Sequence, residues 1–206
     1  MKKVFIFLVI ALLIVFGYLH YERMNNPVVP PAQPATPIET PKPGTYTGAD
    51  FSFTYDPQFT ATGNDSTTPW RVNTTSEGVL LAKVNIPDTF EPSTNFRGAT
   101  FTVGRSDSVE GIRDCRIPTN GERMKGTKTI DGVTWNIITL TDAGAGNYYD
   151  TTSYRYLING SCYALEYTIH STNIGNYDPG QGIAEFDTQK VVSVLETMVD
   201  SFQFTK

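Results

Sequence analysis

Groups that carry out chemistry are scarce in this chain of 206 residues. It has two cysteines and two histidines, and one of the histidines, His20, lies beside an apolar N-terminal run. The chain contains no Gly-x-Ser-x-Gly elbow, no Gly-Lys-Ser/Thr loop and no Cys-x-x-Cys pair. These patterns are typical of α/β-hydrolases, phosphate-binding loops, and zinc or thiol-redox sites. The sequence therefore predicts no catalytic residue, no metal site and no cofactor.

Basic residues are also sparse beyond the N-terminus. From Thr45 onward the chain has 12 Lys and Arg against 19 Asp and Glu, a net charge of about −7. A domain of this sign repels the phosphate backbone of nucleic acids. We therefore expect no nucleic-acid partner.

Residues 4–18 form an uncharged apolar run. Extended to Tyr21, the run would be about 27 Å long as a helix, close to the thickness of the hydrocarbon core of a bilayer. Lys2 and Lys3 precede it, so the positive-inside rule places the N-terminus in the cytoplasm and the rest of the chain across the membrane. Residues 1–24 are therefore predicted to be a cytoplasmic stub and a single-pass signal-anchor, with the lipid bilayer as its partner.

A cleaved signal peptide is the alternative, because its basic start and apolar stretch look much the same. No small-x-small cleavage site follows the run, which continues as Leu19-His20-Tyr21. We therefore expect the anchor to be retained. No cysteine lies near the run, which argues against a bacterial lipoprotein.

Residues 25–44 hold seven of the thirteen prolines. Proline at this density prevents helices and sheet ladders and favours an extended polyproline II chain. This segment is predicted to be a linker that spaces the following domain from the membrane. A proline-recognition site for a partner is the alternative interpretation.

The remaining residues, 45–206, show mostly β patterns. The strongest signal is the segment 151–170, in which Asn159-Gly160 is a preferred pair for a two-residue type I′ turn. This turn predicts that Tyr156 lies opposite Tyr163 and that Tyr154 lies opposite Leu165. Further strands are predicted at residues 51–55, 79–86, 99–103 and 133–140, with a hairpin turn at Asp131-Gly132 and a hairpin loop at residues 142–147.

The predicted hairpin gathers tyrosines on one face, and this face needs a cover. Residues 187–201 supply one, because Asp187 is a good N-cap and an apolar stripe that includes Val191 and Leu195 follows it. Residues 202–204 are expected to close the sheet as a last strand. The predicted fold is α+β: an antiparallel sheet with a C-terminal helix on one face and a short helix on the other.

The short helix is predicted within residues 106–116, capped by Ser106 or Asp107. Cys115 and Cys162 are the only cysteines, and in an oxidising compartment two such cysteines usually pair. Cys162 lies on the face opposite the tyrosines. We therefore expect a Cys115–Cys162 disulfide that holds the short helix over that second face.

Two segments are candidates for function. His170 is the only histidine of the domain, and a Ser-His-Asp set could be imagined around it, although a surface histidine at a strand end is the preferred interpretation. Residues 171–185 form a long stretch without regular pattern, and such loops are often functional. Asn176, Tyr177 and Asp178 are its candidate partner-contact residues, and a plain insertion is the alternative.

The two ends of the domain resemble PsbP-like domains of bacterial envelope proteins. The stretch Phe51-Ser-Phe-Thr-Tyr-Asp-Pro57 is similar to their Phe-x-Phe-x-Tyr-Pro opening, with Asp56 inserted. Ser201-Phe-Gln-Phe204 is similar to their Ser-Phe-x-Phe ending. The resemblance implies an antiparallel sheet flanked by helices and a chiefly non-enzymatic role, with no catalytic residues to carry over.

We therefore expect a membrane-tethered, extracytoplasmic binding or accessory module of the cell envelope, with an envelope protein as its partner. Two alternatives stay open at this point. One is an envelope hydrolase with an unrecognised site, and the other is the ectodomain of a sensor complex.

Overall fold

The computed structural model describes residues 2–25, 42–63, 70–73 and 76–205. It divides into two compact units, Met1–Thr40 and Pro41–Lys206, each described by itself. Most of the predicted proline-rich linker, residues 26–41, lies outside the described residues. The predicted linker also ends slightly late, because Gly44 already begins the first strand of the domain.

The first unit contains the helix α1, Lys2–Asn25. Its described side chains between Leu12 and Tyr21 are all exposed. Within the described residues no helix is both long enough and apolar enough to cross a membrane. The retained single-pass anchor stays a prediction.

The second unit is built on one large antiparallel sheet with the strand order β3-β5-β6-β10-β9-β8-β7, and β4 pairs with the end of β5. Its strands are β3 (Thr60–Gly63), β4 (Trp70–Arg71), β5 (Glu77–Ile86), β6 (Phe96–Ser106), β7 (Arg123–Ile130), β8 (Val133–Gly144), β9 (Asn147–Ile158) and β10 (Ser161–Thr172). The predicted strands at 79–86, 99–103 and 133–140 are all present, and each is longer than the pattern indicated.

Tight turns set the register of the central strands. Asn159 and Gly160 both have positive φ, at 51° and 75°, which is the backbone of the predicted type I′ turn. Tyr156 accordingly lies opposite Tyr163, and Tyr154 lies opposite Leu165, as predicted. Both residues also have positive φ in the turns at Asp131-Gly132 and Ala145-Gly146. The loop predicted at residues 142–147 is therefore a tight two-residue turn.

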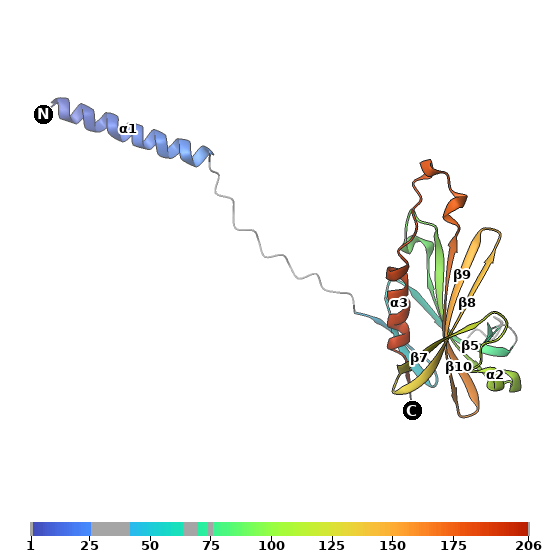
Figure 1. Ribbon diagram of the computed structural model, residues 1–206. Coiled ribbons are helices and arrows are strands. Elements are labelled where there is room, and N and C mark those ends of the chain that lie inside the picture. Colours follow the sequence, from blue (N-terminus) through green and yellow to red (C-terminus); the bar gives the residue numbers. More distant parts are fainter. Residues whose placement is uncertain (1, 26–41, 64–69, 74–75, 206) are drawn as a thin grey trace. The chain divides into compact units, whose positions relative to one another are not determined.

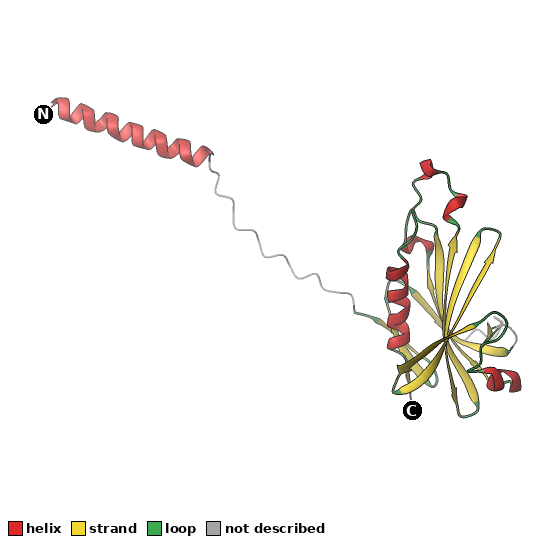
Figure 2. Ribbon diagram, viewed as in Figure 1, coloured by secondary structure: helices red, strands yellow, loops and turns green. Residues whose placement is uncertain are grey.

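The helix α3, Thr188–Asp200, covers the tyrosine face of the sheet (Figure 2). It begins where predicted, because the Asp187 carboxylate accepts a hydrogen bond from the Lys190 amide at 3.0 Å. Val191, Leu195, Met198 and Val199 are completely buried, in one core cluster with Tyr154, Tyr163 and Leu165 of the hairpin. The predicted packing of the C-terminal helix on the aromatic face is confirmed.

A second, three-stranded sheet lies beside α3. It has the order β1-β2-β11, formed by β1 (Gly44–Thr47), β2 (Phe51–Tyr55) and β11 (Gln203–Phe204). The prediction that the last strand closes the main sheet is therefore wrong. Phe51, Phe53 and Phe202 are buried in the same core as α3. The small sheet is therefore stabilised by burying its apolar side chains against the main sheet.

The opposite face of the main sheet carries the disulfide. Cys115 and Cys162 are bonded, with Cα atoms 5.6 Å apart, which lies in the normal range. Both cysteines belong to a second core cluster with Trp70, Val72, Leu80 and Ala164. The predicted disulfide is confirmed, and so is its position on the sheet face opposite the tyrosines.

The short helix of this face, α2, spans Val109–Asp114 and is capped by Ser108, whose hydroxyl accepts a hydrogen bond from Gly111. The predicted caps, Ser106 and Asp107, are wrong, and each has another role. Ser106 still belongs to β6 and its hydroxyl donates to the carbonyl oxygen of Glu77. Asp107 accepts a hydrogen bond from the Ser161 hydroxyl at 2.6 Å.

Candidate functional site

The disulfide face of the main sheet is covered only in part. The disulfide and α2 lie over the end of β10 that starts at Ser161. Further along the strands, the side chains of this face are polar and half-buried or exposed. We call this region the open face, defined by Asn85, Thr100, Thr102, Tyr149, Thr151, Glu166, Thr168 and His170, which share one side of the sheet by their pairing.

The first of two hollows in the open face surrounds His170 and has a volume of about 340 Å³. We call it the His170 hollow; its lining residues are Asn85, Ile86, Arg97, Gly98, Ala99, Thr100, Tyr149, Thr168 and His170. The imidazole stacks on the Tyr149 ring, with centroids 4.5 Å apart and planes 14° apart. Burial, and then the charge of Arg97, lower the pKa of His170, so its ring is neutral at pH 7.

His170 does not form the Ser-His-Asp set considered from the sequence. Its Nε2 atom lies 2.8 Å from the side-chain oxygen of Asn147, and its ring contact is the Tyr149 stack. Asn147 is neither a nucleophile nor a carboxylate, so this contact does not activate a hydroxyl group. The hollow instead offers a neutral imidazole, an aromatic ring, hydroxyl groups and one guanidinium group.

The candidate partner-contact loop follows β10 and lies at the same end of the domain as the β8–β9 turn (Figure 1). The predicted irregular segment 171–185 is shorter than expected, because Ser171 and Thr172 belong to β10. It also contains two single-turn 3₁₀ helices, η2 (Ile174–Asn176) and η3 (Pro179–Gln181). The loop therefore has regular structure of its own.

Tyr177 connects this loop to the His170 hollow. Its hydroxyl group lies 2.6 Å from that of Thr172 and also accepts a hydrogen bond from Arg97. The Arg97 guanidinium carbon lies 5.7 Å from the centre of the Tyr177 ring, a cation–π geometry. Tyr177 and His170 therefore flank the same arginine.

The other two candidate residues of the loop hold its shape. The side-chain amide of Asn176 donates to the carbonyl oxygen of Gly146 at 3.2 Å, which fastens the loop to the β8–β9 turn. The backbone amide of Asp178 donates to the Gln181 side chain at 3.0 Å, which closes η3. Of the three predicted contact residues, only Tyr177 reaches the hollow through Arg97.

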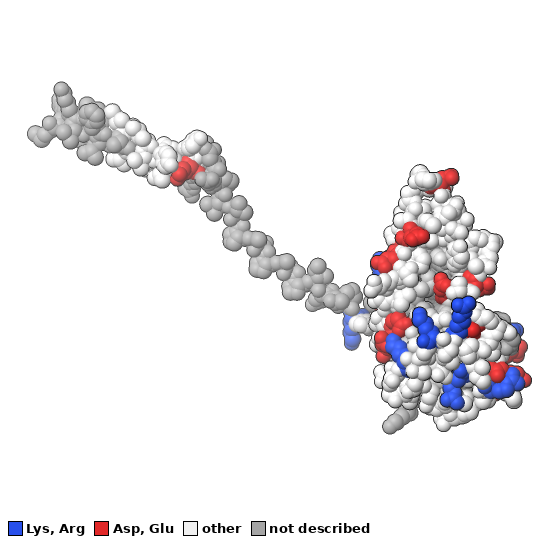
Figure 3. Space-filling model, viewed as in Figure 1, with Lys and Arg blue, Asp and Glu red and all other residues white. Residues whose placement is uncertain are grey.

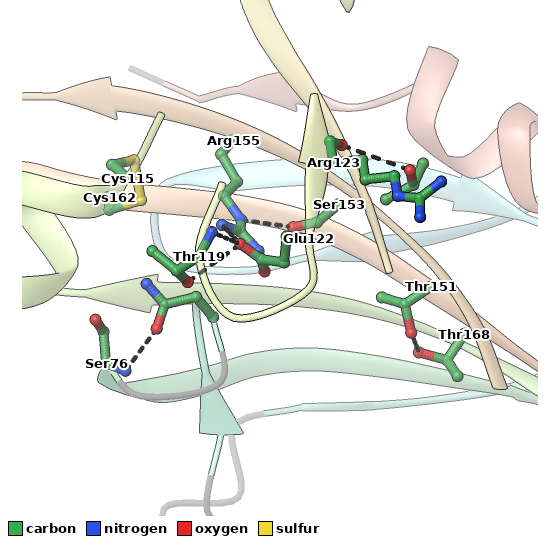
Figure 4. A network of polar contacts seen from close by, with 12 residues as sticks. Ser76, Cys115, Thr119, Glu122, Arg123, Thr151, Ser153, Arg155, Cys162 and Thr168 are labelled. Atoms are coloured by element: carbon green, nitrogen blue, oxygen red, sulfur yellow. Dashed lines mark hydrogen bonds and ion pairs between the residues drawn. A yellow bond between two sulfur atoms is a disulfide. The ribbon is translucent and has the colours of Figure 1, made fainter. Parts of the chain in front are cut away.

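The second hollow lies next to the first, toward the disulfide, and has a volume of about 160 Å³. We call it the Glu166 hollow; it is lined by Glu122, Arg155, Glu166, Thr151 and other residues of β8, β9 and the segment 71–73. Arg155 and Glu122 form a two-pronged ion pair, with side chains only 2% and 3% exposed. Figure 4 shows this pair near the disulfide, with Ser153 to the right of the guanidinium group, from which its hydroxyl accepts a hydrogen bond at 3.0 Å.

Glu166 is the titrating group of this hollow. Burial raises the pKa of its carboxyl group to about 7, against the lowering effects of Arg155 and Ser153. The Glu122 carboxylate raises it further. Near neutral pH the side chain is therefore close to half protonated and acts as both donor and acceptor.

The register of the hairpin puts Arg155 and Glu166 on the same face as Cys162, but sequence reasoning missed the ion pair. Glu122 lies in the connection between α2 and β7, 33 residues before Arg155. Its backbone and side chain are fixed locally, because the Thr119 amide donates to the Glu122 carboxylate at 2.9 Å. No sequence spacing joins Glu122 to a strand so far along the chain, so only the folded sheet reveals the pair.

No family model matches the chain, and no curated protein matches it at a significant level. The resemblance to PsbP-like domains therefore stays a hypothesis.

Proposed function

We propose that this chain is a membrane-tethered, extracytoplasmic binding or accessory module of the cell envelope and is not an enzyme. In this proposal, the N-terminal helix holds the chain in the lipid bilayer with its N-terminus in the cytoplasm. The linker then presents the domain to a partner in the envelope. The proposed module resembles PsbP-like domains, which are chiefly non-enzymatic.

The disulfide supports the export of the domain. Cys115 is 1% exposed and Cys162 is fully buried, and such bonds form and persist in oxidising compartments outside the cytoplasm. Charge supports the same view, because the acidic domain is suited to solubility and not to nucleic acids.

The observation that carries a binding role is the ordered loop beside the His170 hollow. Tyr177 is held by Thr172 and Arg97, and Tyr149 is held by its stack on His170. Tyrosine contributes a large contact area at low cost in conformational entropy, and it is enriched in binding surfaces for that reason. Tyr149 lines the hollow, and Tyr177 is held against Arg97, another of its lining residues. A surface with its side chains fixed in this way is arranged to bind before any partner arrives.

An envelope hydrolase is the second candidate, and one observation favours it. The Glu166 carboxyl group, with its pKa raised to about 7, has the protonation behaviour of a general acid. Its neighbour Glu122 is less suited to act as the second carboxylate, because both of its oxygens accept hydrogen bonds from Arg155. Binding is therefore the better supported function.

The proposal is tested with the full chain in a bacterial expression host. We expect external protease to remove the domain from spheroplasts, and thiol alkylation to find Cys115 and Cys162 oxidised. A domain that stays protected and carries free thiols would overturn the proposed location.

Binding is tested with the full chain in lipid nanodiscs and washed envelope fragments, which are pelleted together. We expect the Tyr177→Ala variant to pellet roughly tenfold less, the cost of removing an aromatic anchor. Val109→Ala is the matched control, because Val109 is an exposed apolar side chain of α2 outside both hollows. Equal pelleting of the native chain and empty nanodiscs would overturn the binding role.

A further inference from the structure

We propose that the open face binds an extended oligosaccharide along β9 and β10, with the Tyr149 ring as its stacking platform. This inference rests on the proposed binding function and names the chemical class of the ligand. Sugar rings have an apolar C–H face and a rim of hydroxyl groups. A surface that recognises them needs an exposed aromatic ring beside polar groups that both donate and accept hydrogen bonds.

The aromatic platform is Tyr149. Its side chain is 39% exposed even though its ring is stacked on His170. The stack fixes the orientation of the Tyr149 ring before a ligand binds, so little rotamer freedom is left to lose. The lowered pKa of His170 favours its neutral ring, which suits contact with a C–H surface.

A row of hydroxyl groups crosses the sheet next to this platform. Thr168 of β10 lies opposite Thr100 of β6 and opposite Thr151 of β9. Neighbouring strands are about 4.8 Å apart, so the three side chains form a short regular row. Hydroxyl groups donate and accept, as the hydroxyl groups of a sugar do, and Asn85 opposite Thr100 adds an exposed amide.

The floor of the His170 hollow is open because a glycine lies opposite His170. Gly98 pairs with His170 in the sheet and has a φ of 122°, a value that side chains rarely adopt. Any other residue would strain the strand, and its Cβ would lie 3.1 Å from the carbonyl oxygen of Ile86, which also lines the hollow. The resulting volume of about 340 Å³ lies at the small end of ligand pockets, which span about 300–1,000 Å³.

The two hollows adjoin and give the site its length. Thr151 lines the Glu166 hollow and Thr168 lines the His170 hollow, and their hydroxyl groups are 2.9 Å apart. From Tyr149 to Arg155 the strand advances six residues, or about 20 Å at 3.3–3.4 Å per residue. This length suits several sugar units in an extended chain rather than a single small molecule.

The charges of the open face favour an uncharged chain. Arg155 is paired with Glu122. The other charged side chains on or beside this face have both signs: Arg71, Lys83 and Arg97 against Asp142 and Glu166. In Figure 3 the Lys and Arg side chains gather mainly over the lower half of the domain in that view, and the upper half shows a few Asp and Glu patches among uncharged residues. A polyanion would find little net positive charge at this site.

The experiment uses the full chain in lipid nanodiscs, with chitotetraose and cellotetraose as probes. Saturation-transfer NMR and titration measure contact and affinity, and empty nanodiscs are the blank. We expect at least one probe to bind with a Kd of about 1 mM or tighter. Saturation should be strongest on the ring C–H protons, because these meet the Tyr149 ring.

Two variants locate the site. Tyr149→Ala should weaken binding roughly tenfold, as for an aromatic anchor. Thr100→Val keeps the shape of its side chain but lacks the hydroxyl group, and it should weaken binding by a few-fold. Tyr148→Ala is the matched control, because Tyr148 is 38% exposed but points to the other side of β9, where it lines a separate hollow.

Failure of this inference is distinguishable from failure of the proposed function. If neither probe binds at about 5 mM while the chain still pellets with envelope fragments, the oligosaccharide is wrong and the binding module stands. If a probe binds the native chain but binds Tyr149→Ala and Thr100→Val with the same affinity as the native chain, the proposed site is wrong. An equal loss for Tyr148→Ala and Tyr149→Ala also overturns it, because the effect is then not specific to the open face.

Discussion

Replacing Glu166 by glutamine should remove a large part of the pH dependence of the stability of the domain. Burial raises the pKa of this carboxyl group from 4.5 to about 7 in the folded protein. Between these two values the folded state keeps a proton that the unfolded state releases. The free energy of unfolding therefore falls as pH rises from about 4.5 to about 7, and the penalty is complete above that range.

The size of the effect follows from the same interval. A shift from 4.5 to about 7, at about 1.4 kcal/mol for each pH unit, gives about 3 kcal/mol. Solvent reaches the half-buried side chain of Glu166, and screening lowers this figure. We expect about 1–3 kcal/mol. Glutamine has the same shape and stays neutral, so it avoids the cost of burying a charge.

Guanidinium unfolding of the unit Pro41–Lys206 at a series of pH values measures the effect. Glu166→Gln should match the native protein near pH 4.5 and should be more stable by about 1–3 kcal/mol near pH 8. Glu110→Gln is the control, because Glu110 is an exposed residue of α2. A stability difference that does not change with pH, or that favours the native protein at high pH, would refute the burial argument.

Further predictions concern the core, the covalent link, the ion pair and the anchor. Leu195→Ala should destabilise the domain by about 2–5 kcal/mol in guanidinium unfolding, and a loss below about 0.5 kcal/mol would contradict the burial of Leu195 between α3 and the sheet. Reduction of Cys115–Cys162 should lower the melting temperature, because a loop of 47 residues is worth about 3–4 kcal/mol. The near-UV circular dichroism of the aromatic core should survive reduction, because the disulfide lies on the opposite face of the main sheet. Its loss would contradict this independence of the two faces. Arg155→Met should cost about 3–5 kcal/mol by leaving a buried carboxylate alone, and adding Glu122→Leu should restore most of it. N-terminal sequencing of the mature protein should find the anchor attached, and a start between the apolar run and β1 would show cleavage.

The parts of the fold that the sequence predicted well depend on local signals. Asn159-Gly160 fixes one turn type, and a turn type fixes the pairing of every residue in the two strands that it joins. Asp187 and the stripe after it define a helix with a single apolar side. With those two elements placed, Cys162 could only face away from the helix, which is why the disulfide was predictable.

The errors arose where distant segments compete for the same partner. Nothing within residues 202–204 indicates whether they pair with the main sheet or with β2, because that choice depends on the total core that each arrangement buries. The helix cap moved to Ser108 because β6 continues through Ser106, whose hydroxyl is committed to Glu77. A capping pattern in sequence does not show where a preceding strand ends.

The sequence indicated where the candidate site lies but not most of the residues that form it. The length of the loop after β10 indicated a functional element, and Tyr177 is part of the arrangement found. Its partner Arg97 lies 80 residues earlier, and the Tyr149–His170 stack joins two strands that no motif connects. Sites built from the face of a sheet depend on register across several strands, so they become visible only once the strands are aligned.

Tyr46 has a mechanical consequence in the proposed tethered protein. Its strand, β1, is the first element after the linker and has only four paired residues. The Tyr46 ring stacks on Phe51 and Phe53 with centroids 5.8 Å and 5.3 Å away, and its hydroxyl donates to the carbonyl oxygen of Leu81 in β5 at 3.1 Å. Tension on the linker would therefore enter the domain through the short pairing of β1 with β2 and through the Tyr46 side chain, whose contacts reach both sheets. This makes β1 the element that a pulled domain would release first.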